Sequence, residues 1–127
     1  MNFYDTNTFF ERIKKPLQNE DIMISSITLD YCTELNVNVP KDFDENVNVL
    51  DYEDYMLHDL EKRFNNGDTK YATILIPTNE IKDLAVAYAC DSYLYPDETV
   101  FISNDLSART RANRVFGSDS IDSIEEW

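Results

Sequence analysis

Carboxyl groups are the side chains whose number and spacing could do chemistry in this sequence, and they gather in one segment. Residues 30–61 hold ten acidic side chains and one lysine, and so carry −9 of the formal net charge of −14. Like charges packed together repel one another, so we interpret the segment as a binding surface, with a merely solvated acidic face as the alternative. The residues that we expect to contact a partner are Asp42, Asp44, Glu45, Asp51, Glu53, Asp54, Tyr55, Asp59 and Glu61.

The spacing of these carboxylates could imitate the phosphates of a nucleic acid. Side chains three or four positions apart on a helix lie ~5–6 Å from each other, and alternate residues of a strand lie ~6.5–7 Å apart. Phosphates of one DNA strand follow every ~3.4 Å along the axis, and farther apart along the helical path. Pairs such as Asp51 with Asp54, or Asp42 with Asp44, could therefore occupy the basic groove of a nucleic-acid enzyme.

The stretch from Asp42 to Glu53 also resembles an EF-hand calcium loop. Oxygen-bearing side chains stand at loop positions one, three, five and twelve. However, Val47 stands where the loop needs a glycine, and a β-branched residue tolerates positive φ poorly. Residues 35–40 before it have the pattern of a strand and a proline breaker, not of the entering helix. We therefore predict no calcium site, no other metal site and no cofactor.

The basic residues and the histidine give weaker indications of a functional site than the carboxyl groups do. Arg109, Arg111 and Arg114 form one basic cluster that could grip a phosphate or a carboxylate. We favour internal pairing instead, with the acidic C-terminal residues or the acidic segment, because so acidic a chain needs internal counter-charges. His58 is the one histidine, which excludes a multi-histidine metal site, and no nucleophile or pocket is evident beside it.

Length and composition set the protein class. The 127 residues, 43% of them hydrophobic, suffice for one folded domain. A sequence pI near 4.2 argues against direct binding to nucleic acid or to an anionic membrane. No stretch approaches the ~20 apolar residues of a membrane span, and the N-terminus lacks a signal-peptide pattern. Cys32 and Cys90 fit no metal spacing and are expected to be free thiols, so we expect a cytoplasmic protein.

The hydrophobic pattern predicts an α+β or α/β domain over residues 1–117, followed by a short acidic tail over residues 118–127. It contains a single small sheet of about four strands and about four helices. Strands are expected over 22–29, 35–39, 71–77 and 99–103. Helices are expected from Thr8 to near Pro16, from Asp51 to near Gly67, after a cap at Thr78 or Asn79, and from a cap at Asn104 or Asp105 to Gly117. The last two strands and the helix between them form one β-α-β unit.

In composition the chain resembles the small acidic inhibitors that phages and mobile elements encode: anti-CRISPR proteins, anti-restriction proteins and uracil-DNA glycosylase inhibitors. This resemblance implies a non-catalytic inhibitor that binds the basic nucleic-acid-binding surface of a host enzyme. An immunity protein or antitoxin against a basic toxin nuclease is an alternative. A small-ligand-binding or enzymatic α/β domain that uses the β-α-β unit, Thr78, Asn79 and the arginine cluster is another. A deep pocket would favour this last class, and a flat, continuous acidic face would favour the inhibitor.

Overall fold

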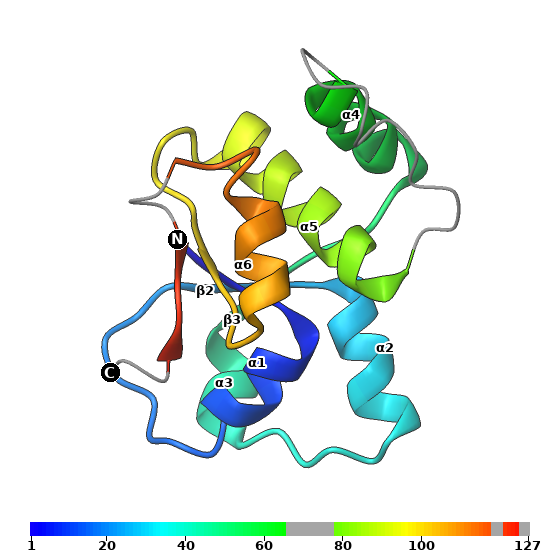
Figure 1. The fold of residues 1–127 in the computed structure, drawn as a ribbon. Helices are drawn as coiled ribbons and strands as arrows, with labels where there is room; N and C mark the ends of the chain where they lie inside the picture. The colour runs from blue at the N-terminus through cyan, green and yellow to red at the C-terminus, as the bar shows by residue number, and fades with distance from the viewer. Residues whose placement is uncertain (66–77, 118–120, 125–127) are drawn as a thin grey trace.

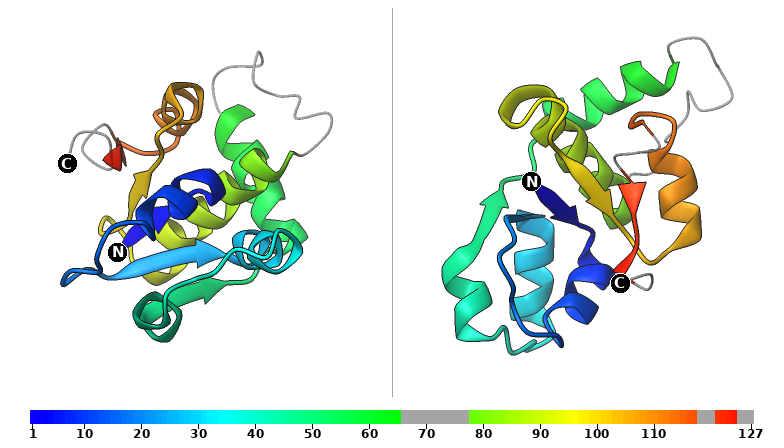
Figure 2. Two further views of the ribbon diagram at one scale, coloured as in Figure 1. Left: turned by 90° about the horizontal axis from the view of Figure 1, so that it is seen from below. Right: turned by 90° about the vertical axis from the view of Figure 1, so that its left-hand side faces the viewer.

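Five parallel strands form the centre of the molecule. The computed structural model describes residues 1–65, 78–117 and 121–124, and within them the strand order is β3-β2-β1-β4-β5. In the left view of Figure 2, β2 and β3 lie side by side and point the same way. The single sheet confirms the α/β expectation, with five strands where about four were expected. The strands are β1 (Asn2–Tyr4), β2 (Ile22–Ser25), β3 (Val47–Leu50), β4 (Val100–Ile102) and β5 (Ile121–Asp122).

The helices form a layer on each face of this sheet (Figure 1). Consecutive strand residues point to opposite faces, so Phe3 and Phe101 pack with α4, α5 and α6. Their neighbours Tyr4 and Ile102 pack with α1, α2 and α3. The helices are α1 (Thr6–Arg12), α2 (Ser26–Glu34), α3 (Lys41–Asn46), α4 (Asp54–Asn65), α5 (Asn79–Ala89) with its π-helical continuation η2 (Cys90–Leu94), and α6 (Leu106–Ala112).

The starts of α1, α2 and α4 differ from the sequence-based expectation, and α4 begins at Asp54 rather than at Asp51. Asp5, not Thr8, caps α1, and its carboxylate accepts a hydrogen bond from the Thr8 amide. The predicted strand over 22–29 ends at Ser25, because the Ser25 hydroxyl accepts a hydrogen bond from the Thr28 amide and begins α2. A side-chain cap therefore overrides the strand propensity of the β-branched residues that follow.

The other differences between the predicted and the observed elements begin in the middle of the chain. Residues 35–39 are not a strand, and α3 and β3 stand in the following segment, where no strand was predicted. The predicted strand over 71–77 lies outside the described residues. The helix capped by Thr78 and the strand that ends near Ser103 are confirmed as α5 and β4, and Asp105 is confirmed as the cap of α6. That helix ends at Ala112, before Gly117.

Residues at the two ends of the chain add strands that the pattern did not reveal. β1 has three residues and β5 has two, so neither is long enough to show a period of its own. β5 pairs with β4, and Ile124 after it is only 4% exposed. Part of the expected tail therefore belongs to the sheet and its core.

Two further expectations can be compared with the described residues. Cys32 and Cys90 are buried free thiols, as expected, and burial raises the pKa of both. In the part of the chain that the structure describes, no helix combines the length and apolar character needed to cross a membrane.

Candidate functional site

A cavity of about 590 Å³ lies at the carboxyl ends of β1 and β4. The chain places β2 and β3 on one side of β1, and β4 and β5 on the other. The strand order therefore reverses between β1 and β4. In open α/β sheets, ligands bind outside the carboxyl ends of the strands at such a reversal. The topology alone thus marks this cavity as the candidate site.

Asp5 forms the floor of the cavity where β1 ends. Asp5 is only 7% exposed. One carboxylate oxygen accepts a hydrogen bond from the Thr8 amide at 3.0 Å, and the other accepts one from the Ser103 hydroxyl at 2.5 Å. The Asp5 amide also donates to the Ile102 carbonyl. Because β1, α1 and β4 all bond to this one residue, its carboxylate is held in place.

Asp83 reaches the same floor from the first half of α5 and is 2% exposed. It accepts hydrogen bonds from the Thr6 amide at 3.0 Å, the Thr6 hydroxyl at 2.7 Å and the Ser25 hydroxyl at 2.6 Å. Burial, with a smaller contribution from the charge of Asp5, raises the pKa of Asp83 to about 6, although the three hydrogen bonds oppose the shift. Two neighbouring carboxyl groups thus share a largely buried position.

The segment after β4 supplies the other wall. The Asn104 amide donates to the Thr8 hydroxyl at 2.9 Å. The side-chain oxygen of Asn104 accepts hydrogen bonds from the Ser123 hydroxyl and the Ile124 amide, so the residues after β5 fix its orientation. Asp105 is exposed at the mouth and accepts a hydrogen bond from the Ser107 amide.

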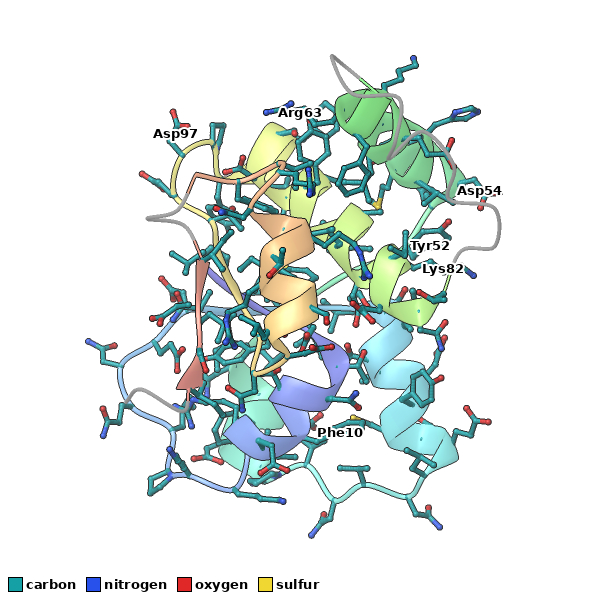
Figure 3. All side chains as sticks on the ribbon, in the orientation of Figure 1. Phe10, Tyr52, Asp54, Arg63, Lys82 and Asp97 are labelled. Carbon is teal, nitrogen blue, oxygen red and sulfur yellow. The ribbon has the colours of Figure 1, made fainter. Side chains whose placement is uncertain are left out.

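The rim of the cavity is partly apolar. Phe10 projects from α1 (Figure 3), and Tyr31 and Leu35 lie at the end of α2. Asn79 donates a hydrogen bond to the Tyr31 hydroxyl and so connects α5 to α2 across the rim. Asn79, named from the sequence, therefore lines the cavity, whereas Thr78 caps α5 by accepting the Ile81 amide.

The cavity carries a strong negative charge. Five carboxyl groups line it, and none of its described lining residues is lysine, arginine or histidine. Glu11 pairs with Lys14, and Glu80 pairs with Arg111. The remaining three are Asp5, Asp83 and Asp105, whose hydrogen-bond donors are hydroxyl and amide groups. The cavity is therefore suited to a cation and unsuited to a bare anion.

The acidic residues predicted to bind a partner lie elsewhere. Asp42, Asp44 and Glu45 are exposed on α3, before β3, and the others lie after β3, up to and along α4. Figure 1 shows α3 and α4 at opposite ends of the molecule. The structure therefore does not bring the nine residues into one continuous row, although it leaves most of them exposed.

Side-chain contacts on α4 are local. Asp59 accepts a hydrogen bond from the Tyr93 hydroxyl at 2.7 Å, which raises the pKa of that tyrosine. Tyr55 packs edge-on against Tyr93. The exposed His58 has Glu61 4.0 Å away. Residues 42–53 fold as part of α3, β3 and the segment before α4, and so do not form an EF-hand loop.

Arg109 and Arg111 of the arginine cluster have internal partners, and neither partner belongs to the acidic tail or to the acidic segment. Arg109 donates to the Ser103 carbonyl at 2.6 Å, and Arg111 pairs with Glu80. Arg114 is exposed beyond the end of α6. Arg109 and Arg111 therefore support the cavity from outside, and neither is among its described lining residues.

Sequence reasoning did not find Asp5, Asp83 or Asp105 as site residues. Asp105 was recognised only as a cap. Asp83 had a signal, because it lies in a helix whose other buried positions are apolar, and a buried acid there needs partners. Asp5 had little signal, because the three-residue strand before it is too short to recognise.

Comparison of the chain with protein-family models and with curated proteins finds no match.

Proposed function

We propose that the cavity binds a divalent cation of the Mg²⁺ or Mn²⁺ type and that the protein hydrolyses a phosphodiester there. The observation that carries this proposal is a cavity at the sheet reversal with Asp5, Asp83 and Asp105 and no basic lining residue among those described. Oxygen ligands are those that Mg²⁺ prefers. Because Asp5 and Asp83 are each less than one-tenth exposed, a small ion suits them better than an organic cation.

The cavity could supply only a few of the ligands of such an ion. Within the described residues, no three acidic, histidine or cysteine side chains are grouped closely enough to hold a metal together. Mg²⁺ in enzymes commonly uses only one or two carboxylates and keeps several waters and substrate phosphates as its other ligands. Asp5 or Asp83 would hold the ion, with Asp105 at the mouth near the substrate.

The charge of the cavity also selects the substrate. A bound divalent ion would neutralise phosphate charge and make water a better nucleophile. In the reaction, water adds to phosphorus and one ester P–O bond breaks. The leaving oxygen takes a proton, so the products are an alcohol and a phosphate monoester. A diester carries one negative charge and a monoester up to two, so an acidic cavity repels the diester less.

This proposal develops the ligand-binding or enzymatic alternative that the sequence left open. A pocket was the feature expected to favour that alternative, and the cavity of about 590 Å³ supports a protein that binds a small ligand. The proposed site differs in one respect from the sequence-based alternative, which included the arginine cluster. Arg109 and Arg111 support the site from outside and are not proposed to bind the ligand.

The test is hydrolysis of bis(p-nitrophenyl) phosphate and of a single-stranded oligonucleotide, with Mn²⁺, with Mg²⁺ and with EDTA. We expect turnover only with metal, and at least a tenfold loss in Asp105→Asn, typical of losing one positioned polar group in an active site. Asp97→Asn, an equally conservative change at an exposed site outside the cavity, is the control. Turnover unaffected by EDTA, or an equal loss in the control, would contradict the proposal.

A second candidate is the acidic inhibitor of a basic nucleic-acid enzyme, or the immunity protein. The observation that favours it is the exposure of carboxylates on α3 and at the start of α4. Neutralising Asp42, Asp44, Asp51 and Asp54 together should abolish inhibition of any basic nuclease that the protein inhibits, measured at low salt. Association should also weaken steeply with salt. Undiminished inhibition by the fourfold variant would exclude this candidate.

A further inference from the structure

We propose that the outer edge of β3 binds a basic, extended segment of a partner protein as an added strand. The inference goes beyond the function proposed for the cavity. It develops the second candidate, the acidic inhibitor or immunity protein. From that candidate it takes the expectation that the partner is basic. It replaces a row of phosphate-like charges with a backbone edge as the binding element.

The first argument is the position of β3. It ends the strand order, and it pairs with β2 in parallel register from Val47 opposite Ile22 to Leu50 opposite Ser25. In the described residues, no strand pairs with its other side. An unpaired edge offers backbone N–H and C=O groups to an incoming strand, which is how several peptide-binding domains take their ligands.

The second argument is the apolar surface beside that edge. Val49 on β3 is 41% exposed and Leu29 on α2 is 43% exposed. Together with the half-buried Val39 and Val47 they line a small groove of about 40 Å³. Alternate side chains of an added strand point to one face. One side chain on that face of the partner segment could therefore cover this small groove, and an apolar side chain fits best.

The third argument is charge. Exposed carboxylates precede β3 at Asp42 and Asp44 and follow it at Asp51 and Glu53, so both ends of a four-residue strand are acidic. Lys41, the basic residue nearest in sequence, is engaged with a neighbouring carboxylate, that of Glu45, at 3.7 Å. The wider segment 30–61 carries −9.

This charge decides which occupant fits. A second copy of the chain would bring the same carboxylates to the edge, and like charges facing each other oppose strand pairing. A segment with lysine or arginine at both ends and apolar residues between them would be attracted. Asp44 lines the groove itself and could pair with a basic side chain there. The structure thus favours a basic strand over self-association.

The test uses the synthetic peptide Lys-Lys-Val-Thr-Val-Lys-Lys, whose central residues alternate. Binding is measured by calorimetry in 50 mM and 300 mM salt, and amide hydrogen exchange is followed for residues 47–50. A peptide with the same side chains but N-methylated central amides is the matched control, because it keeps the charge and cannot pair as a strand. We expect affinity to fall at least tenfold at the higher salt concentration, since several charge contacts are screened.

Protein variants locate the contact. Asp44→Asn with Asp51→Asn removes one charge from each end of β3, and we expect about a tenfold loss of affinity. Asp97→Asn with Glu98→Gln removes the same net charge from another surface; Figure 3 shows Asp97 and Asp54 on opposite sides of the molecule. The first variant should weaken peptide binding far more than the second.

The outcomes separate the two ideas. Slower exchange in residues 47–50 with the unmodified peptide only, and a loss confined to the β3 variant, support the edge site. Equal binding of the N-methylated peptide, with no slowing of exchange, overturns the edge site and leaves the acidic-surface candidate standing. Failure of the basic peptide to bind at 50 mM salt overturns the edge site, and inhibition assays then decide the second candidate separately.

Discussion

Replacing Asp83 with asparagine is expected to stabilise the protein at neutral pH and, where Asp83 holds the proposed ion, to lower the metal-dependent hydrolysis at least a hundredfold. Asparagine keeps the shape of the side chain, so its oxygen can accept from Thr6 and its amide can donate to Ser25. Only the buried charge is lost. The pKa of Asp83 is raised from 3.8 to about 6, which corresponds to ~3 kcal/mol of penalty for the ionised form.

The pH dependence follows from the direction of that shift. The folded protein holds the Asp83 proton more tightly than the unfolded chain does, so the stabilising contribution is complete below pH ~4 and is lost as pH rises through 6. Urea unfolding of the wild type and of Asp83→Asn should therefore give similar free energies at pH 4 and an advantage of ~1–3 kcal/mol for the variant at pH 7.5.

A second substitution controls for packing. Asp83→Ala removes the charge but also leaves the Thr6 amide and the Ser25 hydroxyl without their acceptor, which costs ~1–3 kcal/mol for each unsatisfied buried group. We expect Asp83→Ala to be less stable than Asp83→Asn, and both to lose at least a hundredfold in turnover if Asp83 holds the ion. A destabilised Asp83→Asn that still turns over at the wild-type rate would show that this carboxylate neither carries a buried charge nor serves the site.

Replacing Glu20 with alanine is expected to cost ~3–5 kcal/mol, because it leaves a buried arginine without its counter-ion. Arg12 is 3% exposed, and its guanidinium lies 2.9 Å from Glu20. The other oxygen of Glu20 accepts hydrogen bonds from Asn2 and from the fully buried Tyr4 hydroxyl. Burial, followed by this contact, raises the pKa of Tyr4. One carboxylate thus serves three partners from β1 and α1.

The control is an ion pair of the same kind on the surface. Glu11 and Lys14 lie 3.0 Å apart, but their side chains are 54% and 67% exposed. Glu11→Ala should change the unfolding free energy by less than ~1 kcal/mol, because water solvates the remaining charge. Chemical denaturation of both variants at pH 7 measures the contrast. Equal effects would mean that water reaches Arg12 once Glu20 is removed.

Local signals were sufficient for some elements of the fold. The sequence predicted the apolar face of α5 and narrowed each of two helix caps to a pair of residues, of which Thr78 and Asp105 form the caps, because capping and periodicity act over a few residues. The predicted strand over 22–29 was too long, because the residues after the Ser25 cap are β-branched and apolar like those of a strand. β1 and β5 escaped notice because strands this short have almost no pattern.

The two candidate sites differ in how far the sequence could define them. The acidic segment is contiguous, so counting charges found its residues, but not their separation by β3 onto α3 and α4. The cavity is built from Asp5, Asp83 and Asp105, which are up to 100 positions apart. No local spacing rule connects such residues.

The sequence by itself determined the net charge, the acidic segment, the free thiols and the α/β character of the domain. Only the tertiary structure decided that three aspartates line one cavity and that β3 has an open edge within the described residues. The physical reason is that parallel pairing aligns the carboxyl ends of strands that are distant in sequence. Charge and propensity belong to individual residues, whereas a cavity and an edge arise only from the order of the strands.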